Sequence, residues 1–457
     1  MSTGIVHLGL GAFFRAHGAI YIQEAMMRSA GDWDITGVSL MSPGQRDRMK
    51  PQNFTYHAVE QGPKGEVPQL VTSVRDVLVA REDPSAVIEL MASASVKIVS
   101  LTVTEKGYCH IPATGELDRE HPGIVHDLAE DLPQTAPGYL VRALQRRRSA
   151  GLAPFTVLTC DNLPQNGHVV RRVVVEMASL IDPQLAEWIA TEGRFPSTMV
   201  DRIVPATRDE DIARLAAAGI HDQAPVFHEP FRQWVIEDDF VGGARPDFGL
   251  DVQMVRDVKP FEDMKLRCLN GTHSALAYLG YLAGFETVAD ASPDPVFAAY
   301  LKRLWTREII PTLVPPEGVD LAGYAAALLE RYQNPAIRHR LWQIAMDGSQ
   351  KLPQRILGTV ADALEARREV PGLMLAIAAW LQYVSGSTLD GAPIEVKDPL
   401  AAELKAAVAG GTDAVLMLRQ VFPAELAENP AFRAALGEAR ALLSEKGARG
   451  AAQAVIG

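Results

Sequence analysis

Short runs of apolar residues recur along the first half of the chain, and each is followed by a segment whose apolar residues have helical spacing. The runs are Ile5–Leu8, Ile35–Leu40, Ile98–Val103, Phe155–Leu158 and Met199–Val204. Strands that are almost continuously apolar are typical of a parallel sheet covered by helices on both faces. The pattern therefore predicts an α/β domain over residues 1–250, with the carboxyl ends of its strands lining a ligand crevice.

The second half of the chain has long segments of helical spacing. These segments are Lys265–Leu282, Pro295–Thr306, Leu321–Tyr332, Ala336–Asp347, and Ala361–Arg368 continuing to Val384. They predict a mainly α-helical domain over residues 251–457, joined to the first domain through a hinge at Gly242–Pro246. The most apolar stretch, Leu373–Val384, is shorter than the roughly 20 residues that span a bilayer, and it indicates a buried helix.

Composition and charge exclude several classes of protein. The 457 residues are 47% hydrophobic and 22% charged, with a formal net charge of -12. This balance excludes a disordered chain, and the absence of a long run of Lys or Arg argues against nucleic-acid binding. Cys109, Cys160 and Cys268 are too scattered for a disulfide framework or a zinc site. Because the N-terminal GIVHLGLG is a strand-and-glycine pattern and not an export signal, we expect a cytoplasmic protein that does not associate with membranes.

A glycine-rich turn, Gly9-Leu10-Gly11, follows the first predicted strand and precedes a helical segment. Glycines in a strand–turn–helix unit allow the pyrophosphate of a dinucleotide to approach the backbone at the start of the helix. Phe14 occupies the position of the third glycine, so an ordinary strand-to-helix turn is the alternative. The second strand is followed by Arg46, Asp47 and Arg48, and no acid lies directly at its end, which leaves NAD and NADP both open.

Lys265, Asn270 and His273 are candidate catalytic residues. On one α-helix they lie within roughly a 140° arc, so they can share one wall of a cleft. Oxidation of an alcohol needs a base beside the hydroxyl group and amide donors on the developing oxyanion, and a buried lysine can be that base. Since Lys265 and His273 are about 12 Å apart along a straight helix, we expect the lysine to precede the helix or to reach back over it. The alternative is an ordinary surface lysine.

Asn162 lies in the stretch Cys160–Gly167, at the end of a predicted strand. Its amide there would complement that of Asn270, and an Asx turn before Pro164 is the alternative. Neither His-Glu-x-x-His nor Gly-x-Ser-x-Gly occurs in the sequence. We therefore expect neither a metal site nor a serine nucleophile.

Seven motifs occur in order along the chain. They are Gly9-x-Gly11-x-Phe13-x-Arg15-Ala16-His17, SLTVTEKGY, CDNLPQNG, MVDRIVP, EPFRQWVIED, Lys265-x-x-x-x-Asn270-x-x-His273 and DGSQKLPQR. Together they resemble the polyol-specific long-chain dehydrogenases, or mannitol dehydrogenase family. The resemblance implies a zinc-independent, NAD(P)-dependent enzyme with a Rossmann-type N-terminal domain, a mainly helical C-terminal domain and an active site between them. The chain departs from the family at Phe14, where a histidine is usual, and at His228, where a cysteine is common.

The resemblance also implies roles for individual residues. Lys265 matches the general acid/base of the family, and Asn162 and Asn270 match the asparagines that hold the reacting oxygen. Other residues match those that contact the substrate or organise the site, namely Asp201, His273 and Lys351. The residues expected at the cofactor are Gly9, Gly11, Phe13, Arg15, Thr104 and Asp161.

Within the family, Glu105–Tyr108 and the stretches KLRCLNGTHS and HRLWQIAMDGSQKLPQR are most similar to the branch that interconverts D-mannonate and D-fructuronate. A hexuronate carries a carboxylate, so an additional cation is expected in its pocket, and Lys106, Arg267 and Arg355 are candidates. A polyol dehydrogenase acting on mannitol or arabinitol is one alternative, and a non-catalytic nucleotide-binding regulatory protein is another. We expect a sugar acid or polyol as substrate and NAD as cofactor, with NADP not excluded, in a monomer or small homo-oligomer.

Overall fold

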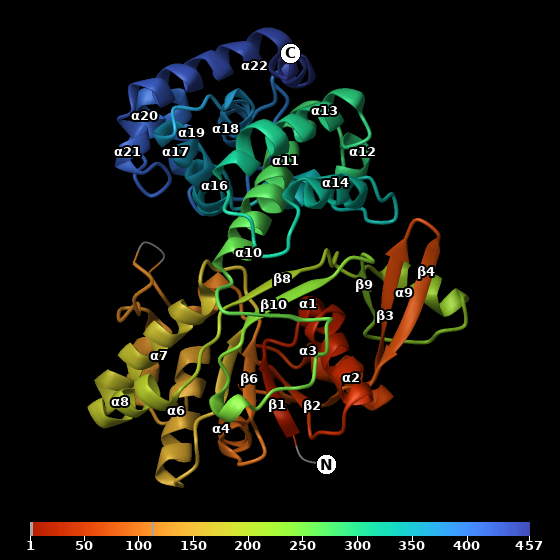
Figure 1. Cartoon of the computed structure of the whole chain (residues 1–457), viewed down its shortest axis with the longest axis vertical. Coiled ribbons are helices and arrows are strands. Elements are labelled where there is room, and N and C mark those ends of the chain that lie inside the picture. The colour runs from red at the N-terminus through yellow and green to blue at the C-terminus, as the bar shows by residue number, and fades with distance from the viewer. Residues whose placement is uncertain (1–2, 112–113) are drawn as a thin grey trace. The chain divides into compact units, whose positions relative to one another are not determined.

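The computed structural model describes residues 3–111 and 114–457, and the chain forms two compact units, Met1–Lys259 and Pro260–Gly457 (Figure 1). The first unit contains all the strands among the described residues, whereas the second is built from helices. The predicted hinge Gly242–Pro246 lies inside the first unit, where Val241–Gly243 forms a short 3₁₀ turn. Each unit has its own apolar core.

A five-stranded parallel sheet is the centre of the first unit, with strand order β5-β2-β1-β6-β7. Its strands are β1 (Thr3–Leu8), β2 (Asp34–Ser39), β5 (Val74–Val79), β6 (Ile98–Leu101) and β7 (Thr156–Thr159). The strand order reverses direction between β1 and β6, and ligands bind at such a switch point in doubly wound sheets. The predicted Rossmann-type sheet is therefore confirmed.

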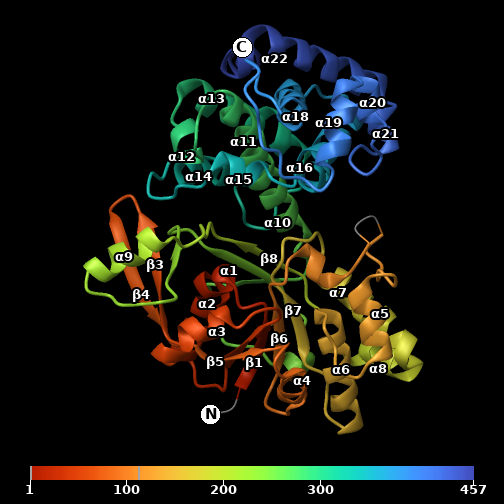
Figure 2. The ribbon, with the colours of Figure 1, turned by 180° about the vertical axis from the view of Figure 1, so that it is seen from behind.

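Helices cover both faces of this sheet (Figures 1 and 2). The helices of the unit are α1 (Ala12–Ala16), α2 (Gly18–Arg28), α3 (Gly44–Met49), α4 (Pro84–Ala92), α5 (Pro122–Ala129), α6 (Ala136–Ser149), α7 (Asn166–Ile181), α8 (Pro183–Glu192) and α9 (Asp209–Ala217). Val6 and Leu8 of β1 pack with α4, α6 and α7, while Ile5 packs with α1 and α2 on the opposite face. Alternate side chains of one strand thus enter two separate cores, which explains the unbroken apolar pattern of β1.

One predicted strand lies in a different sheet. The run Met199–Val204 corresponds to β8 (Thr198–Asp201), which pairs antiparallel with β10 (Gln233–Glu237) in a three-stranded sheet with β11 (Gln253–Val255). Its assignment to the parallel sheet is wrong, because an apolar run indicates burial but does not specify the partner strand.

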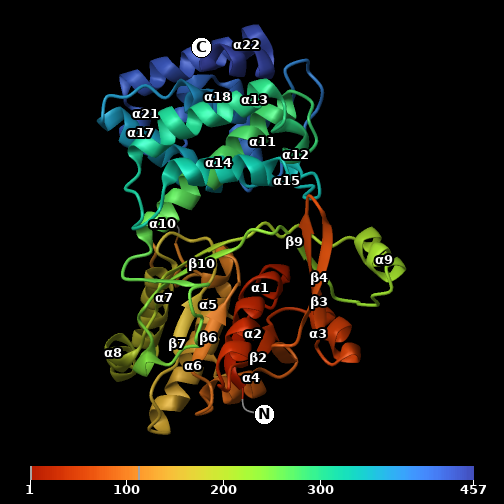
Figure 3. The same cartoon turned by 45° about the vertical axis from the view of Figure 1, so that its right-hand side comes forward.

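Six strands among the described residues were not predicted from the sequence: β5, β10, β11 and the three strands of a further sheet. The edge strand β5 carries the exposed charges Arg75 and Asp76, so it lacks the apolar pattern of its neighbours. A hairpin of β3 (Tyr56–Gly62) and β4 (Gly65–Val71) pairs with β9 (Val226–His228), as Figure 3 shows.

The second unit is helical, as predicted. Its helices are α10 (Lys259–Met264), α11 (Thr272–Leu282), α12 (Val288–Ala291), α13 (Pro295–Arg303), α14 (Leu321–Tyr332), α15 (Leu341–Ala345), α16 (Gly348–Leu352), α17 (Gly358–Glu365), α18 (Pro371–Val384), α19 (Ala401–Ala409), α20 (Thr412–Leu416), α21 (Ala424–Ala427) and α22 (Pro430–Ile456). The helix predicted over Ala336–Asp347 is shorter than expected, since only α15 forms there.

Helix α18 lies at the centre of the second core and packs against α11 and α22. It contains the apolar stretch Leu373–Val384, and the prediction of a buried helix is confirmed. The buried Glu308 carboxylate accepts hydrogen bonds from the backbone N–H groups of Gly372 and Leu373, at 3.0 and 2.8 Å. These bonds satisfy donors of the first turn of α18. In the part of the chain that the structure describes, no helix is long and apolar enough to cross a membrane.

Candidate active site

The glycine turn after β1 has the open backbone that a dinucleotide requires. Gly9 has a φ of +88°, and a Cβ at this position would lie 2.2 Å from the carbonyl oxygen of Thr102, so only glycine fits between β1 and the end of β6. At Gly11 a Cβ would meet no heavy atom closer than 3.8 Å. Packing within the protein therefore does not require glycine at this exposed position. The open space fits the close approach of a bound pyrophosphate.

Phe14, which replaces the third glycine, faces the interior. Its ring stacks on the imidazole of His7, with centroids 3.4 Å apart and planes 9° apart, and it is fully buried. His7 in turn makes hydrogen bonds with Ser100 and Thr102 of β6 and the loop after it, at 2.8 and 2.9 Å. Phe14 thus stabilises the packing of α1 on β1, and its side chain lies away from the solvent.

Two further residues of the glycine motif differ in their surroundings. The Arg15 guanidinium is buried, lies over the Tyr56 ring and donates a hydrogen bond to the Ala224 carbonyl at 2.5 Å. Burial lowers the pKa of Arg15 to about 10. Phe13 is half-buried and stacks on His17. The structure thus gives Arg15 an internal partner, and its role toward the cofactor stays a prediction.

The loop after β6 contains Thr104 in an unusual backbone conformation. Its φ is +64° and its ψ is 166°, a region that residues other than glycine rarely adopt. The Asp161 carboxylate accepts hydrogen bonds from the N–H groups of Val103 and Thr104, at 2.9 and 3.0 Å, and from the hydroxyl of Tyr108 at 2.6 Å. Lys106 lies exposed in the same loop.

The two polar residues predicted at the ends of β7 and β8 occupy different environments. Asn162 is exposed directly after Asp161, whereas Asp201 is buried at the end of β8, opposite Gln233 of β10. Asn166 links the loop after β7 to the start of β8. Its side-chain NH2 group donates to the carbonyls of Asp161 and Thr198, and its side-chain oxygen accepts from the Thr198 N–H, each at 2.9 Å.

In the second unit, the predicted catalytic residues lie on one continuous helix. After α10 the helix continues as a π-helical segment, Lys265–Gly271, and then as α11. Lys265 is therefore inside the helix and does not precede it, while the alternative that its side chain reaches back over the helix stays a prediction. Backbone hydrogen bonds in a π-turn join residues five apart, which brings Lys265 and Asn270 toward one face, whereas an α-helix separates them by about 140°.

Burial of this set agrees with a catalytic role and not with a surface lysine. Lys265 is 9% exposed, Asn270 is 8% exposed and His273 is 5% exposed. The Asn270 Oδ1 and His273 Nε2 atoms are buried, and neither has a hydrogen-bond partner in the structure. Buried polar atoms without partners are costly, so their retention is typical of groups that bind a ligand.

Side chains from other helices satisfy the carbonyls that the π-segment displaces. Trp305 Nε1 donates to the Cys268 carbonyl at 2.8 Å, and the Tyr332 hydroxyl donates to the Leu269 carbonyl at 2.8 Å. The Thr272 hydroxyl lies 2.5 Å from the Cys268 carbonyl and 2.9 Å from the Tyr332 hydroxyl. The irregular turn is thus stabilised by specific partners, as is common for π-turns at functional sites.

A second π-segment, Pro353–Leu357, packs directly on the first. A Cβ at Gly271 would lie 2.7 Å from the Arg355 carbonyl oxygen, so glycine allows the close contact. The Arg355 guanidinium donates to the Ser274 hydroxyl at 3.2 Å. Gly271 thereby brings Arg355 next to the helix that carries the predicted catalytic residues.

Cationic side chains lower the pKa of His273 and of its neighbour His339. Burial is the largest cause that lowers its pKa well below the usual value, and His339, Arg355 and Arg331 lower it further. His339 lies edge-on at 5.5 Å, and its pKa falls to about 4 through burial, Arg355 and Lys351. Both imidazoles are therefore neutral at pH 7, beside three cationic side chains.

The remaining predicted cations, Lys351 and Arg267, both have partners within the protein. Lys351 Nζ donates to the Met346 carbonyl at 2.6 Å. Arg267 forms an ion pair with Asp362 at 2.6 Å and a hydrogen bond with Thr312 at 3.0 Å. The charge of Arg267 is therefore compensated by Asp362.

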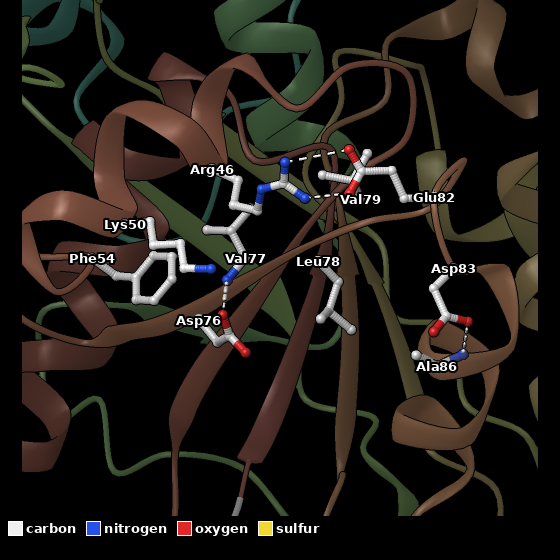
Figure 4. Close-up of a pocket in the computed structure, with 10 residues that line it drawn as sticks. All are labelled: Arg46, Lys50, Phe54, Asp76, Val77, Leu78, Val79, Glu82, Asp83 and Ala86. Atoms are coloured by element: carbon white, nitrogen blue, oxygen red, sulfur yellow. Dashed lines mark hydrogen bonds and ion pairs between the residues drawn. The ribbon is translucent and has the colours of Figure 1, made fainter.

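A cavity of about 280 Å³ lies along the outer edge of β5, lined in part by Arg46, Val79 and Glu82 (Figure 4). The Arg46 guanidinium and the Glu82 carboxylate point toward one another and form an ion pair. Asp47 also pairs with Arg46, at 2.8 Å. Two carboxylates therefore compensate the charge of Arg46.

The cysteines are buried thiols, and burial raises the pKa of Cys109 and Cys268 to about 12. A thiol with so high a pKa is a poor nucleophile at neutral pH. Over residues 3–111 and 114–457, no group of three His, Cys, Asp or Glu side chains is placed to hold a metal ion.

A dinucleotide-type α/β unit, joined to a helical unit with a buried lysine beside an amide and an imidazole, defines a dehydrogenase-type oxidoreductase. The two halves of the chain match two family descriptions, the mannitol dehydrogenase Rossmann domain over residues 3–248 and the mannitol dehydrogenase C-terminal domain over residues 257–442. The chain belongs to the mannitol dehydrogenase family, and the predicted family is confirmed.

Individual relatives agree with this assignment. "Uncharacterized oxidoreductase YeiQ" of Escherichia coli (strain K12) is 46% identical over 449 residues, which are 96% of this chain and 92% of that protein. D-mannonate oxidoreductase of the same strain is 45% identical over 461 residues, 98% of this chain and 95% of that protein. The ternary complex of Pseudomonas fluorescens mannitol 2-dehydrogenase with NAD and D-mannitol has a TM-score of 0.91 at 36% identity, and covers 100% of this chain and 94% of its own.

Sequence reasoning missed Trp305, Tyr332 and His339. Tyr332 ends a correctly predicted helix, where apolar spacing indicates only a core position. None of the three lies near Lys265 in the sequence. Folding of the second unit brings Trp305 to the Cys268 carbonyl and brings Tyr332 and His339 to His273. The one available signal was the irregular spacing of Lys265, Asn270 and His273, which fits a π-turn better than an α-helix.

Proposed function

We propose that the protein is an NAD-dependent oxidoreductase that interconverts D-mannonate and D-fructuronate. The observation that carries the proposal is the buried Lys265 on a π-turn with Asn270, next to the cationic surroundings of His273. The 45% identity to a D-mannonate oxidoreductase supports the same substrate pair.

Lys265 is the proposed acid/base. In the reductive direction its ammonium group donates a proton to the substrate oxygen as the carbonyl becomes a hydroxyl, and in the oxidative direction its amine removes that proton. The Asn270 amide donates to the same oxygen, and the His273 Nε2, which has no partner in the protein, orients the substrate. Asn162 of the first unit is the second proposed amide at that oxygen.

Separate residues are proposed to hold the cofactor and the substrate. NAD, when bound, accepts or supplies the hydride. Gly9 and Gly11 leave the backbone open for its pyrophosphate, and the loop at Thr104 borders the same turn. Asp201 and Lys351 are proposed to contact or position the substrate. Because Glu82 and Asp47 compensate the charge of Arg46, we propose a preference for NAD over the 2′-phosphorylated NADP.

The positive surroundings of the catalytic set favour a sugar acid over a polyol. Arg355 lowers the pKa of both buried imidazoles, Arg331 lowers that of His273, and Lys351 lowers that of His339. A carboxylate would be stabilised by such a potential, whereas an uncharged polyol would gain little from it. The buried thiols agree with the reducing cytoplasm as the proposed location.

A polyol dehydrogenase is the second candidate, favoured by the similarity to the mannitol 2-dehydrogenase complex. Oxidation of NADH with D-fructuronate, D-tagaturonate and D-fructose, measured in parallel, distinguishes the two. The proposal predicts a higher kcat/KM for fructuronate than for the other two, and a preference for fructose contradicts it. NADH binding without turnover of any of them would indicate the non-catalytic alternative.

A further inference from the structure

Thr104 has a backbone conformation that needs an external restraint. Its φ of +64° and ψ of 166° lie in a region of backbone conformation that is nearly exclusive to glycine. A threonine remains there only when the surrounding structure holds it. The side chain of Thr104 is exposed, so its packing does not supply that restraint.

Asp161 supplies the restraint from the neighbouring strand. Its two carboxylate oxygens accept hydrogen bonds from the consecutive N–H groups of Val103 and Thr104, at 2.9 and 3.0 Å. Tyr108, which closes the loop, donates its hydroxyl to the same carboxylate at 2.6 Å and also contacts the hydroxyl of Thr159. Although burial raises the pKa of Asp161 to about 6, the group is mainly ionised at pH 7.5 and accepts all three bonds.

The restrained loop borders the glycine turn. The Thr102 hydroxyl donates to the Gly9 carbonyl at 2.8 Å, and the Thr102 carbonyl occupies the space that a Cβ on Gly9 would need. Strands β1 and β6 meet at the switch point of the sheet, where dinucleotides bind. The backbone of residues 102–104 is therefore part of the surface that a dinucleotide meets.

We propose that Asp161 is a positioning residue for the cofactor, which acts through the peptide groups of Val103 and Thr104 and does not itself contact the dinucleotide. Its carboxylate holds the loop after β6 in the strained conformation that leaves the glycine turn open. The inference rests on the proposed function only in taking NAD as the ligand, and it revises the direct cofactor contact expected of Asp161.

Asp161→Asn tests the proposal, because an amide has the same size but its NH2 group cannot accept from a backbone N–H. NADH affinity is measured by fluorescence titration, and the exchange of the Val103 and Thr104 amide hydrogens is measured in the cofactor-free protein. We expect about tenfold weaker NADH binding, together with faster exchange at both amides. Unchanged affinity and unchanged exchange would overturn the proposal.

A second substitution at Thr104 separates positioning from general damage. Glycine adopts the conformation of Thr104 without restraint, so Thr104→Gly should restore most of the affinity in the Asp161→Asn background. Thr104→Ala retains a Cβ and is the matched control that should not restore it. Equal recovery by glycine and alanine, or recovery by neither, would overturn the proposal.

Two further measurements cover the remaining outcomes. If Asp161→Asn does not fold, Asp161→Glu displaces the carboxylate by one methylene group and receives the same pair of Thr104 substitutions, with the same expected and contradicting results. Failure of the unmodified protein to bind NADH would contradict the proposed function. The amide exchange of the cofactor-free protein would still test the restraint by Asp161, since slow exchange that survives Asp161→Asn overturns it.

Discussion

The imidazole of His273 stacks on the phenol ring of Tyr332, with centroids 4.4 Å apart and planes 18° apart. The Tyr332 hydroxyl also donates to the Leu269 carbonyl inside the π-segment that carries Lys265 and Asn270. One side chain from α14 therefore fixes both the orientation of His273 and the irregular turn beside it. Tyr332 thereby links the positions of all three proposed catalytic groups without belonging to the motif that contains them.

Substitution of Tyr332 separates these two contributions. Tyr332→Phe keeps the stacked ring and removes the hydrogen bond, so we expect a destabilisation of about 1 kcal/mol and a severalfold loss in kcat. Tyr332→Leu removes both contacts and leaves a cavity at this buried position, so it should lower both kcat and the melting temperature further. Measurement of kcat and thermal unfolding for the two variants tests this, and equal kcat values in both variants would contradict a role for the stacking.

Arg355 should determine the preference for a carboxylated substrate. Arg355→Met removes the cation next to His273 and His339, and we expect kcat/KM for D-fructuronate to fall by about 100-fold, with a much smaller change for D-fructose. Arg267→Met is the matched control, because the charge of Arg267 is already paired with Asp362. A parallel loss for both substrates would show that Arg355 does not recognise the carboxylate.

The ion pair between Arg46 and Glu82 should disfavour NADP. Glu82→Ala removes one of the two carboxylates around the Arg46 guanidinium, so the arginine becomes available to a 2′-phosphate. We expect the ratio of kcat/KM with NADPH to that with NADH to rise about tenfold. Glu89→Ala, which removes the exposed partner of Arg146, is the control. An unchanged ratio would exclude this pair as a determinant of cofactor choice.

Buried neutral histidines should make the protein less stable in acid. Burial lowers the pKa of His7 and of His228 to about 3, compared with 6.5 in an exposed histidine. Between these values the unfolded chain binds more protons than the folded one, so the free energy of unfolding decreases as the pH falls below about 6.5. The slope approaches about 1.4 kcal/mol per pH unit for each histidine. Asp161, whose pKa is raised to about 6, acts in the opposite direction and offsets part of this loss.

Urea unfolding at pH 7.5 and pH 5.5 measures this effect. His228→Asn should make the loss of stability between the two pH values smaller, since asparagine does not titrate. His168→Asn, at an exposed position, should leave the loss unchanged. The same pH dependence in both variants would contradict the assignment to buried histidines.

Much of the fold could be predicted from the sequence because burial determines the pattern. β1, β2, β6 and β7 are buried on both faces and appear as apolar runs, and α18 is apolar all round. β5 could not be found in this way, because its outer edge faces the solvent and carries Arg75 and Asp76. The pairing of β8 with β10 depends on contacts between distant segments that no local pattern encodes.

The candidate site was predicted residue by residue, but its arrangement was not. The spacing of Lys265, Asn270 and His273 indicated a shared helix, whereas the π-turn depends on Trp305 and Tyr332 from other helices. The pairing of Arg267 with Asp362 could not be found from the sequence, since the two residues lie far apart along the chain. The motif around Arg15 resembled a cofactor contact, yet its guanidinium bonds to the backbone of Ala224.

Replacement of Lys265 tests the central claim most directly. Lys265→Ala should lower kcat for D-fructuronate reduction by about 10² to 10⁴, because no other group at that position exchanges the proton. NADH affinity of the same preparation should stay within twofold of the unmodified protein, and the exposed Lys302→Ala variant should retain full turnover. A Lys265→Ala enzyme that binds NADH and turns over within a few fold of the unmodified protein would contradict the account.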